Sequence, residues 1–156
     1  MTNVANSARI TPFLWFDRNA EEAVEFYLTV FRNSRRISEM RNPGAAPGGE
    51  GTILTIDFEL DGLHFTALNG GPDHKFNEAV SFFIHCESQA EIDYYWERLT
   101  DGGSEIACGW LRDRFGLCWQ VVPVNIMELV GNRKGMEAMM TMKKLDIAAL
   151  EAAVKS

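Results

Sequence analysis

The sequence contains only three cysteines and no long apolar run. The cysteines lie 22 and 10 residues apart, a spacing that predicts neither a disulfide framework nor a CxxC zinc knuckle, so we expect reduced thiols. No window approaches the roughly 18 consecutive apolar residues of a membrane-spanning helix, and the first ten residues lack the apolar core of a signal peptide. These absences predict a cytoplasmic protein with no membrane partner.

Basic residues are also in deficit. The sequence has 15 Lys and Arg against 22 Asp and Glu, which gives a formal net charge of -7 and a pI near 5.0. Proteins that bind nucleic acid concentrate Lys and Arg on one face, whereas the only basic clusters here are the pairs Arg35-Arg36 and Lys143-Lys144. The composition therefore argues against a nucleic-acid partner.

Common catalytic motifs are missing as well. The histidines form no HxxxH pair, and no serine lies in a GxSxG turn. His85, at the end of a predicted strand, is interpreted as a packing residue. Cys108 is the most arguable nucleophile because Arg112 or His85 would acidify a neighbouring thiol, but a small buried strand residue explains it better.

An internal repeat lies within the 156 residues, at an offset of 69. FLWFDRNAEEAVEFY (13–27) lies over FFIHCESQAEIDYYW (82–96), and each segment has the pattern of an apolar strand, an N-cap and an amphipathic helix. Asn19 and Ser88 are the predicted caps, each followed three residues later by a Glu that can close a capping box or a near variant of it. The predicted helices span 20–31 and 89–100.

Three strands are predicted after each helix. The first set includes an Asp61-Gly62 hairpin turn and spans 34–41, 51–60 and 63–69. The second set is shorter and spans 105–108, 110–112 and 117–122. From residue 124 the pattern is that of a helical tail whose methionines are packing residues.

This order predicts an α+β fold of two βαβββ modules, each a small curled sheet with one helix on its outer face. One module cannot cover both faces of its sheet, so we expect the two to form a shared concave trough, a typical place for a ligand. We assign residues 8–123 to one domain made of two repeats, about 8–72 and 78–123, and residues 124–156 to the tail.

Several phrases in this order carry a resemblance to a known family: PFLWFD, NAEEAVEFY, ALNGGP, SFFIHCE, CGWLRDRFGLCWQVVP and MKKLDIAALEAA. They span nearly the whole chain. On them the sequence resembles the vicinal oxygen chelate superfamily, which includes glyoxalase I, bleomycin-resistance proteins and extradiol dioxygenases. Within it the sequence is most similar to the PhnB-like family, whose domain is often labelled 3-demethylubiquinone-9 3-methyltransferase. The resemblance implies the βαβββ repeat and, commonly, a homodimer.

The resemblance also implies where a metal would be held. Catalytic members place four ligands, typically His, Glu or sometimes Gln, on the inner faces of the first and last strands of each module. A two-residue bulge in a strand would bring His64 or Cys118 into one of these ligand positions, but the site would still have two ligands at most. We expect no resident metal, because the corresponding positions offer no adequate donor set. They are Pro12, Thr66, Ser81 and Gln120.

Gln120 interrupts an apolar strand. On alternating strand faces it lies toward the trough, whereas its neighbours Trp119 and Val121 lie toward the helix. A buried amide must form hydrogen bonds. Gln120 either ties strands together through Ser81 or Thr66, or holds a carbonyl or hydroxyl of a ligand, and the sequence leaves both open.

The methyltransferase label finds no support in a cofactor motif. An S-adenosylmethionine site of nucleotide-binding type needs a strand, a GxGxG loop and a helix that starts there. Gly70-Gly71 follows a strand but leads to another strand, and the pairs Gly48-Gly49 and Gly102-Gly103 belong to a loop and a helix end. We expect no cofactor.

The remaining hypothesis is a binding trough with aromatic walls and a few hydrogen-bonding groups. The favoured function is a metal-free homodimer that binds a small aromatic or flat organic ligand, with a cationic one favoured by the acidic surface. The alternative is an enzyme, either a metal-assisted lyase, isomerase or dioxygenase of the superfamily, or the methyltransferase of the label. The predicted ligand-binding residues are Phe16 (with Trp15 as the alternative), Thr66, Leu68, Asn69, Ser81, Phe83, Cys108, Trp110 and Gln120.

Overall fold

The computed structural model describes residues 8–156 of the chain. The chain divides into two compact units, unit 1 ending at Lys75 and unit 2 comprising Phe76–Ser156. The division falls between the two repeats expected from the sequence, and the tail belongs to unit 2. Among the described residues, no helix is long and apolar enough to cross a membrane.

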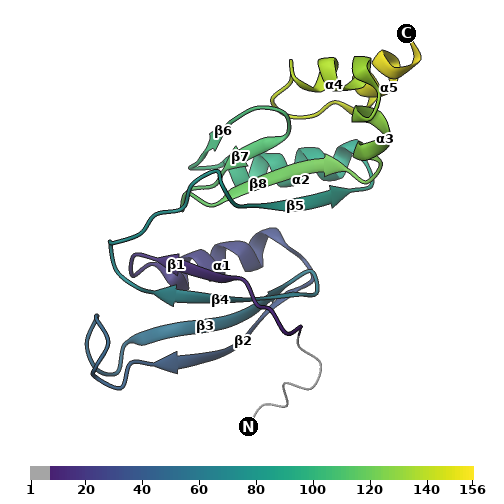
Figure 1. Cartoon of the computed structure of the whole chain (residues 1–156). Coiled ribbons are helices and arrows are strands. Elements are labelled where there is room, and N and C mark those ends of the chain that lie inside the picture. Colours follow the sequence, from purple (N-terminus) through teal and green to yellow (C-terminus); the bar gives the residue numbers. More distant parts are fainter. Residues whose placement is uncertain (1–7) are drawn as a thin grey trace. The chain divides into compact units, whose positions relative to one another are not determined.

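Unit 1 is a four-stranded mixed sheet with one helix (Figure 1). Its sheet order is β1-β4-β3-β2, with β1 parallel to β4 and the other pairs antiparallel. The elements follow the predicted order: β1 (Phe13–Phe16), α1 (Ala20–Val30), β2 (Ser34–Arg41), β3 (Ile53–Leu60) and β4 (Leu63–Asn69).

The core of unit 1 lies between α1 and one face of this sheet. Tyr27 of α1 stacks on Phe58 of β3 with ring centroids 6.4 Å apart, and Phe58 stacks on Phe65 of β4 at 5.3 Å. Successive side chains of a strand point to alternate faces, so the residues directly before and after Phe58 and Phe65 lie on the face away from α1. We call the face opposite the helix the open face of the unit.

Unit 2 repeats the arrangement with shorter strands (Figure 1). Its sheet order is β5-β8-β7-β6, with β5 parallel to β8. Trp119 and Val121 of β8 are buried on the helix face, as predicted. The elements are β5 (Ser81–Cys86), α2 (Gln89–Thr100), β6 (Ser104–Glu105), β7 (Trp110–Arg112) and β8 (Cys118–Pro123). The two modules confirm the predicted α+β fold.

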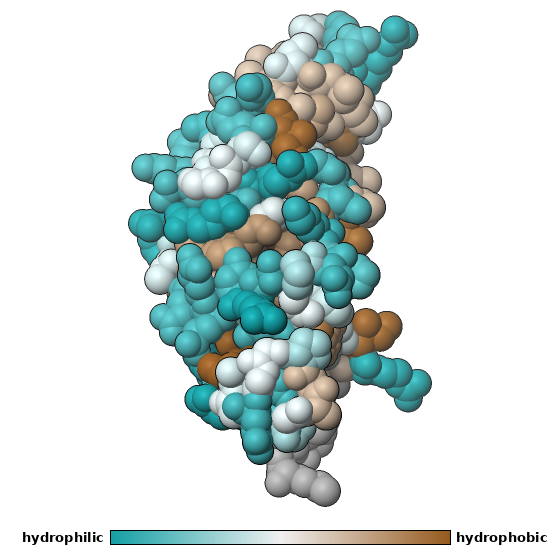
Figure 2. Space-filling model, turned by 90° about the vertical axis from the view of Figure 1, so that its left-hand side faces the viewer, coloured by the Kyte–Doolittle hydropathy of each residue, from teal (hydrophilic) through white to brown (hydrophobic). Residues whose placement is uncertain are grey.

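The tail forms three short helices, α3 (Ile126–Val130), α4 (Arg133–Met139) and α5 (Ile147–Lys155). Apolar side chains of the tail form a small core with the end of β8, made of Val122, Ile126, Leu129, Leu145 and Leu150. Met127, Met136 and Met140 of the tail have exposed side chains, and apolar surface is visible over the tail near the top of Figure 2.

Polar contacts fasten the tail to α2. Gln89 donates from Nε2 to the carbonyl of Leu145 at 3.0 Å and accepts at Oε1 from the Ile147 amide at 2.9 Å. Lys144 pairs with Asp93 at 2.9 Å, and this hydrogen bond lowers the pKa of Asp93. Because these contacts bracket residues 144–147, the start of α5 has a defined place on unit 2.

The two helix caps differ from each other. Ser88 accepts from the Glu91 amide at 3.2 Å, and the Glu91 carboxylate accepts from the Glu87 amide at 2.9 Å, a near variant of the predicted capping box. Asn19 makes no side-chain cap, so that prediction was wrong. Asn69, at the end of β4, instead accepts from the Ala20 amide at 2.9 Å.

The strand predicted at 105–108 is also misplaced. Strand β6 ends at Glu105, and a tight turn follows in which the Trp110 amide donates to the Ala107 carbonyl at 2.9 Å. Cys108 and Gly109 have φ of 56° and 84°. Extended strand backbone requires negative φ, so these residues cannot continue the strand.

Candidate functional site

The two metal-ligand positions of unit 2 are occupied by a hydrogen-bonded pair on its open face. Gln120 donates from Nε2 to Oγ of Ser81 at 2.9 Å. Strand β8 lies beside β5 in parallel register, which places Gln120 next to Phe83. Of the two roles predicted for Gln120, the tie between strands is present, and its Oε1 has no hydrogen-bond donor among the described residues.

The corresponding positions of unit 1 carry no comparable pair. Pro12 contributes its backbone carbonyl, which accepts from the Thr66 amide at 3.0 Å. The Thr66 hydroxyl donates to Oδ1 of Asp57 at 2.7 Å, and Ser38 donates to Oδ2 of the same carboxylate at 3.2 Å. Thr66 is therefore a strand-to-strand tie on the open face of unit 1.

Neither bulge alternative is realised. His64 pairs with Glu59 in a regular β3–β4 ladder, and the irregularities of this sheet lie in β2. The Nε2 atom of His64 is 3.8 Å from Oδ1 of Asp57 and forms no hydrogen bond. Cys118 pairs in register with Ser81 and is fully buried.

Aromatic side chains flank the Gln120 amide. Cross-strand register places Phe83 and Trp110 on either side of it on the open face of unit 2, and Phe83 is 40% exposed. The ring of His85 lies 4.8 Å from that of Phe83. The arrangement is an amide between apolar rings, which suits a flat ligand that has a hydrogen-bond donor.

Unit 1 contributes Trp15 rather than Phe16 to its open face. Phe16 is only 3% exposed and lies on the helix face, in line with Leu14. Trp15 and Leu68 are in register on the opposite face. The structure therefore selects the alternative aromatic residue for this wall, because strand alternation sends neighbouring side chains to opposite faces.

Two other predicted ligand-binding residues have structural partners. Asn69 uses its amide to cap α1 and to donate to the Ile53 carbonyl at 3.0 Å. Cys108 lies in the β6–β7 turn, with its Sγ 3.6 Å from Sδ of Met140 and its amide donating to the Met142 carbonyl. The structure places Cys108 against the tail and does not bring it to Gln120.

The described residues do not fit a resident metal ion. No group of three or more His, Cys, Asp or Glu side chains converges within 8–156. At the expected ligand positions of unit 2, the groups that could hold a metal are the Ser81 hydroxyl and the Gln120 amide. Neutral oxygens of this kind are weak ligands for transition metals.

The structure gives Gly70-Gly71 a role that is not cofactor binding. The Trp15 indole donates to the Gly71 carbonyl at 2.9 Å, and a Cβ on Gly70 would lie 2.3 Å from the Trp15 ring. No helix starts between these glycines and β5. A nucleotide-type S-adenosylmethionine site needs that helix, so the segment does not fit this cofactor.

One buried charged residue was missed by sequence reasoning. Asp113, 2% exposed, accepts from the amides of Phe115 and Leu117 and from the indole of Trp119 at 2.9 to 3.1 Å. The Asp-x-x-Gly turn before β8 was the available signal, because Asp side chains commonly accept from backbone amides two residues on. Asp113 fixes the hairpin that presents Gln120.

Burial also sets the pKa of the Cys86 thiol, because Cys86 is fully buried at the end of β5. Desolvation, with a smaller contribution from the charge of Glu91, raises the pKa of Cys86 to about 12. A thiol held in this way is a poor nucleophile at neutral pH, because the thiolate is the reactive form.

Comparisons with known proteins agree with the fold. Residues 8–122 match the family described as 3-demethylubiquinone-9 3-methyltransferase. A putative 3-demethylubiquinone-9 3-methyltransferase, PhnB protein, from Bacillus cereus is 34% identical, covering 72% of this chain and 97% of that chain, with a TM-score of 0.65. Protein PA1353 from Pseudomonas aeruginosa is 22% identical over 72% and 95% of the chains, with a TM-score of 0.60.

A glyoxylase/bleomycin resistance protein/dioxygenase domain from Frankia sp. EAN1pec is also similar. It is 17% identical over 72% of this chain and 88% of that chain, with a TM-score of 0.47. The search of proteins with curated functions finds no match.

Proposed function

The chain belongs to the 3-demethylubiquinone-9 3-methyltransferase family, and we propose that it binds a small, flat organic molecule without a resident metal ion. The observation that supports this most directly is the open face of unit 2, where the Gln120 amide, tied to Ser81, lies between Phe83 and Trp110. Rings supply contact area, and the free Oε1 of the amide supplies orientation.

A binding role fits these residues better than catalysis does. The face offers no activated nucleophile, and the buried Cys86 is held as a thiol. The donors at the metal positions are neutral, and the family label would need a cofactor that the glycine segment does not fit. The net charge of -7 favours a cationic ligand over an anionic one on this face.

We further propose that the protein is a homodimer. Large apolar side chains on both sheets are exposed in the single chain, including Phe13 of β1 at 60% and Phe83 of β5 at 40%. Exposed apolar side chains of this size are common at interfaces between subunits. Light scattering during gel filtration would measure a mass of twice 17.6 kDa for a dimer.

The binding proposal can be tested by fluorescence quenching with flat aromatic probes of both charges. Acridine orange, a cation, should quench tryptophan emission saturably, and naphthalene-2-sulfonate, an anion, should do so more weakly. Trp110→Ala and Gln120→Leu should both weaken binding of the cation, whereas Tyr94→Ala, on the outer side of α2, should not. Equal binding by all four proteins would contradict the proposal.

Metal analysis provides the second arm. Protein purified without chelator should contain zinc, iron, nickel and manganese far below one equivalent per chain. Near-stoichiometric metal that is lost in Gln120→Leu would favour a metal-assisted enzyme instead.

A further inference from the structure

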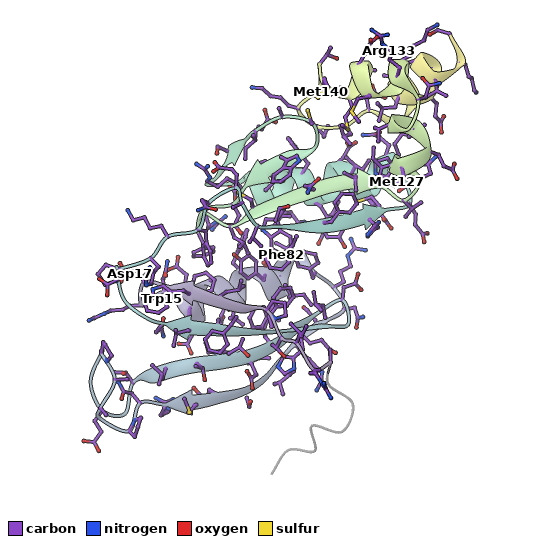
Figure 3. All side chains as sticks on the ribbon, in the orientation of Figure 1. Trp15, Asp17, Phe82, Met127, Arg133 and Met140 are labelled. Carbon is purple, nitrogen blue, oxygen red and sulfur yellow. The ribbon has the colours of Figure 1, made fainter. Side chains whose placement is uncertain are left out.

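Unit 1 contains a separate cavity of about 270 Å³ at the end of the sheet where β1 and β4 stop. It is an open cavity lined by the β1–α1 connection, the end of β4 and the glycine-rich loop between β2 and β3, and Trp15 and Asp17 mark this end of the unit in Figure 3. Residues that line it include Arg18, Pro47, Gly48, Thr52, Ile53 and Asn69. All belong to unit 1, so the cavity does not depend on unit 2.

The charge of this cavity comes from Arg18. Among the residues that the structure describes, none forms a hydrogen bond or an ion pair with its guanidinium, although Asp17 is its neighbour in sequence. Arg18 also has φ of 61°, a left-handed conformation that residues other than glycine rarely adopt. Arg18 is exposed and lines the cavity, and backbone outliers of this kind cluster at ligand and active sites.

The loop that forms the other wall is rigidly built. Asn42, 2% exposed, accepts at Oδ1 from the Gly44 and Ala46 amides and donates from Nδ2 to the Ala46 and Pro47 carbonyls. Its backbone exchanges hydrogen bonds with Gly51 and Thr52 at 2.9 and 2.7 Å. A preorganised wall lowers the entropic cost of binding.

We propose that this cavity binds the carboxylate of a small organic acid, with Arg18 as the anion-binding residue. The planar guanidinium pairs with a carboxylate through two parallel hydrogen bonds. Pro47 and Ile53 supply an apolar wall for the rest of the acid. The volume lies near the lower end of ligand pockets, which limits the ligand to about the size of a single ring with its carboxylate.

A carboxylate is favoured over a phosphoryl group because positive charge is limited. Among residues 8–156, Arg18 is the only cationic side chain that lines the cavity. The first amide of α1, which could otherwise help to bind phosphate, already donates to Asn69. A single planar cation matches a singly charged planar anion.

The test is titration of benzoate into the protein, followed by amide NMR shifts at Gly48 and Gly71 and by the emission of Trp15, whose indole donates to Gly71. Benzoate should bind saturably, while benzamide, a neutral molecule of the same shape, and inorganic phosphate should bind at least about tenfold more weakly. Benzamide or phosphate binding as well as benzoate does would overturn the proposal.

Two variants at Arg18 separate binding from folding. Arg18→Gly and Arg18→Asn both tolerate positive φ, so both should fold and should bind benzoate at least about tenfold more weakly. Arg9→Gln, which removes the same charge from an exposed position, should bind like the parent. Unchanged binding in both Arg18 variants would refute the assignment. Trp110→Ala should leave benzoate binding intact, so this site and the proposed function can fail separately.

Discussion

The indole Nε1 of Trp119 donates to Oδ2 of Asp113 at 2.9 Å, and both residues are almost fully buried. The other oxygen of the carboxylate holds the turn that leads into β8. One acidic side chain thus fixes both the turn and the strand that carries Gln120.

Asp113→Ala should therefore destabilise the protein. The change leaves the Trp119 indole and the Leu117 amide without their acceptor, and each buried unsatisfied donor costs about 1–3 kcal/mol. The loss is measurable as a fall in the urea midpoint of unfolding. Asp101→Ala is the matched control, because Asp101 forms an ion pair with Arg114 while its own side chain is 77% exposed. Exposed ion pairs of this kind contribute about 0–1 kcal/mol to stability. Equal losses in the two variants would contradict this role for Asp113.

The hydrogen bond between Ser81 and Gln120 predicts coupling between the two positions. In a double-mutant cycle of Ser81→Ala and Gln120→Leu, the coupling energy should be about 0.5–1.5 kcal/mol, the usual net value of a neutral hydrogen bond. Chemical unfolding of the four proteins gives this value. Additive effects would mean that the amide is not tied to Ser81 in solution and is fully free for a ligand.

The raised pKa of Cys86 predicts a loss of stability in alkaline solution. The ordinary thiol value is 9.0 and the folded value is about 12. Between these values the unfolded chain releases the proton while the folded chain keeps it, so the free energy of unfolding should fall as pH rises above about 9. Below pH 9 Cys86 should contribute no pH dependence.

Comparison with Cys86→Ala isolates this effect from other alkaline titrations. The variant should lose less stability than the parent between pH 9 and pH 11, as measured by urea unfolding at each pH. In the folded parent at pH 8, Cys86 should resist iodoacetamide while the partly exposed Cys108 reacts. Parallel pH profiles of the two proteins would show that Cys86 is not the cause.

Local patterns predicted most of the elements. The strands 34–41, 63–69 and 110–112 and the helix 89–100 have the bounds expected from the sequence. These segments combine strong periodicity with turn or cap signals, which act over a few residues. For Gln120 the sequence left Ser81, Thr66 and a ligand open as partners, and the structure shows the hydrogen bond to Ser81 in the neighbouring strand.

The failures involve residues that are distant in sequence. The cap of α1 comes from Asn69, 49 residues after the amide it accepts from, and no local signal identifies such a partner. The turn at Cys108 depends on hydrogen bonds to Met142 and Lys143 of the tail. The choice between Trp15 and Phe16 required the strand register. The Arg18 cavity was missed because its lining comes from three segments that are distant in sequence: the β1–α1 connection, the β2–β3 loop and the end of β4.

The close packing of Gly70 against Trp15 leads to the last prediction. A Cβ at residue 70 would lie 2.3 Å from the indole, which is far inside the normal contact distance. Gly70→Ala should displace Trp15 from the open face of unit 1 and cost about 1–3 kcal/mol, as overpacking usually does. The shift should appear as a change in tryptophan emission and a lower midpoint of thermal unfolding.

The same substitution in a Trp15→Ala background provides the control. Without the ring, the added methyl group has no clash, so Gly70→Ala should have little effect on the stability of that variant. Backbone strain is not expected, because Gly70 is not among the glycines with positive φ. If Gly70→Ala destabilises both backgrounds equally, the glycine is required for another reason. If it destabilises only the parent, the ALNGGP segment is a platform for Trp15, and its glycines need no cofactor to account for them.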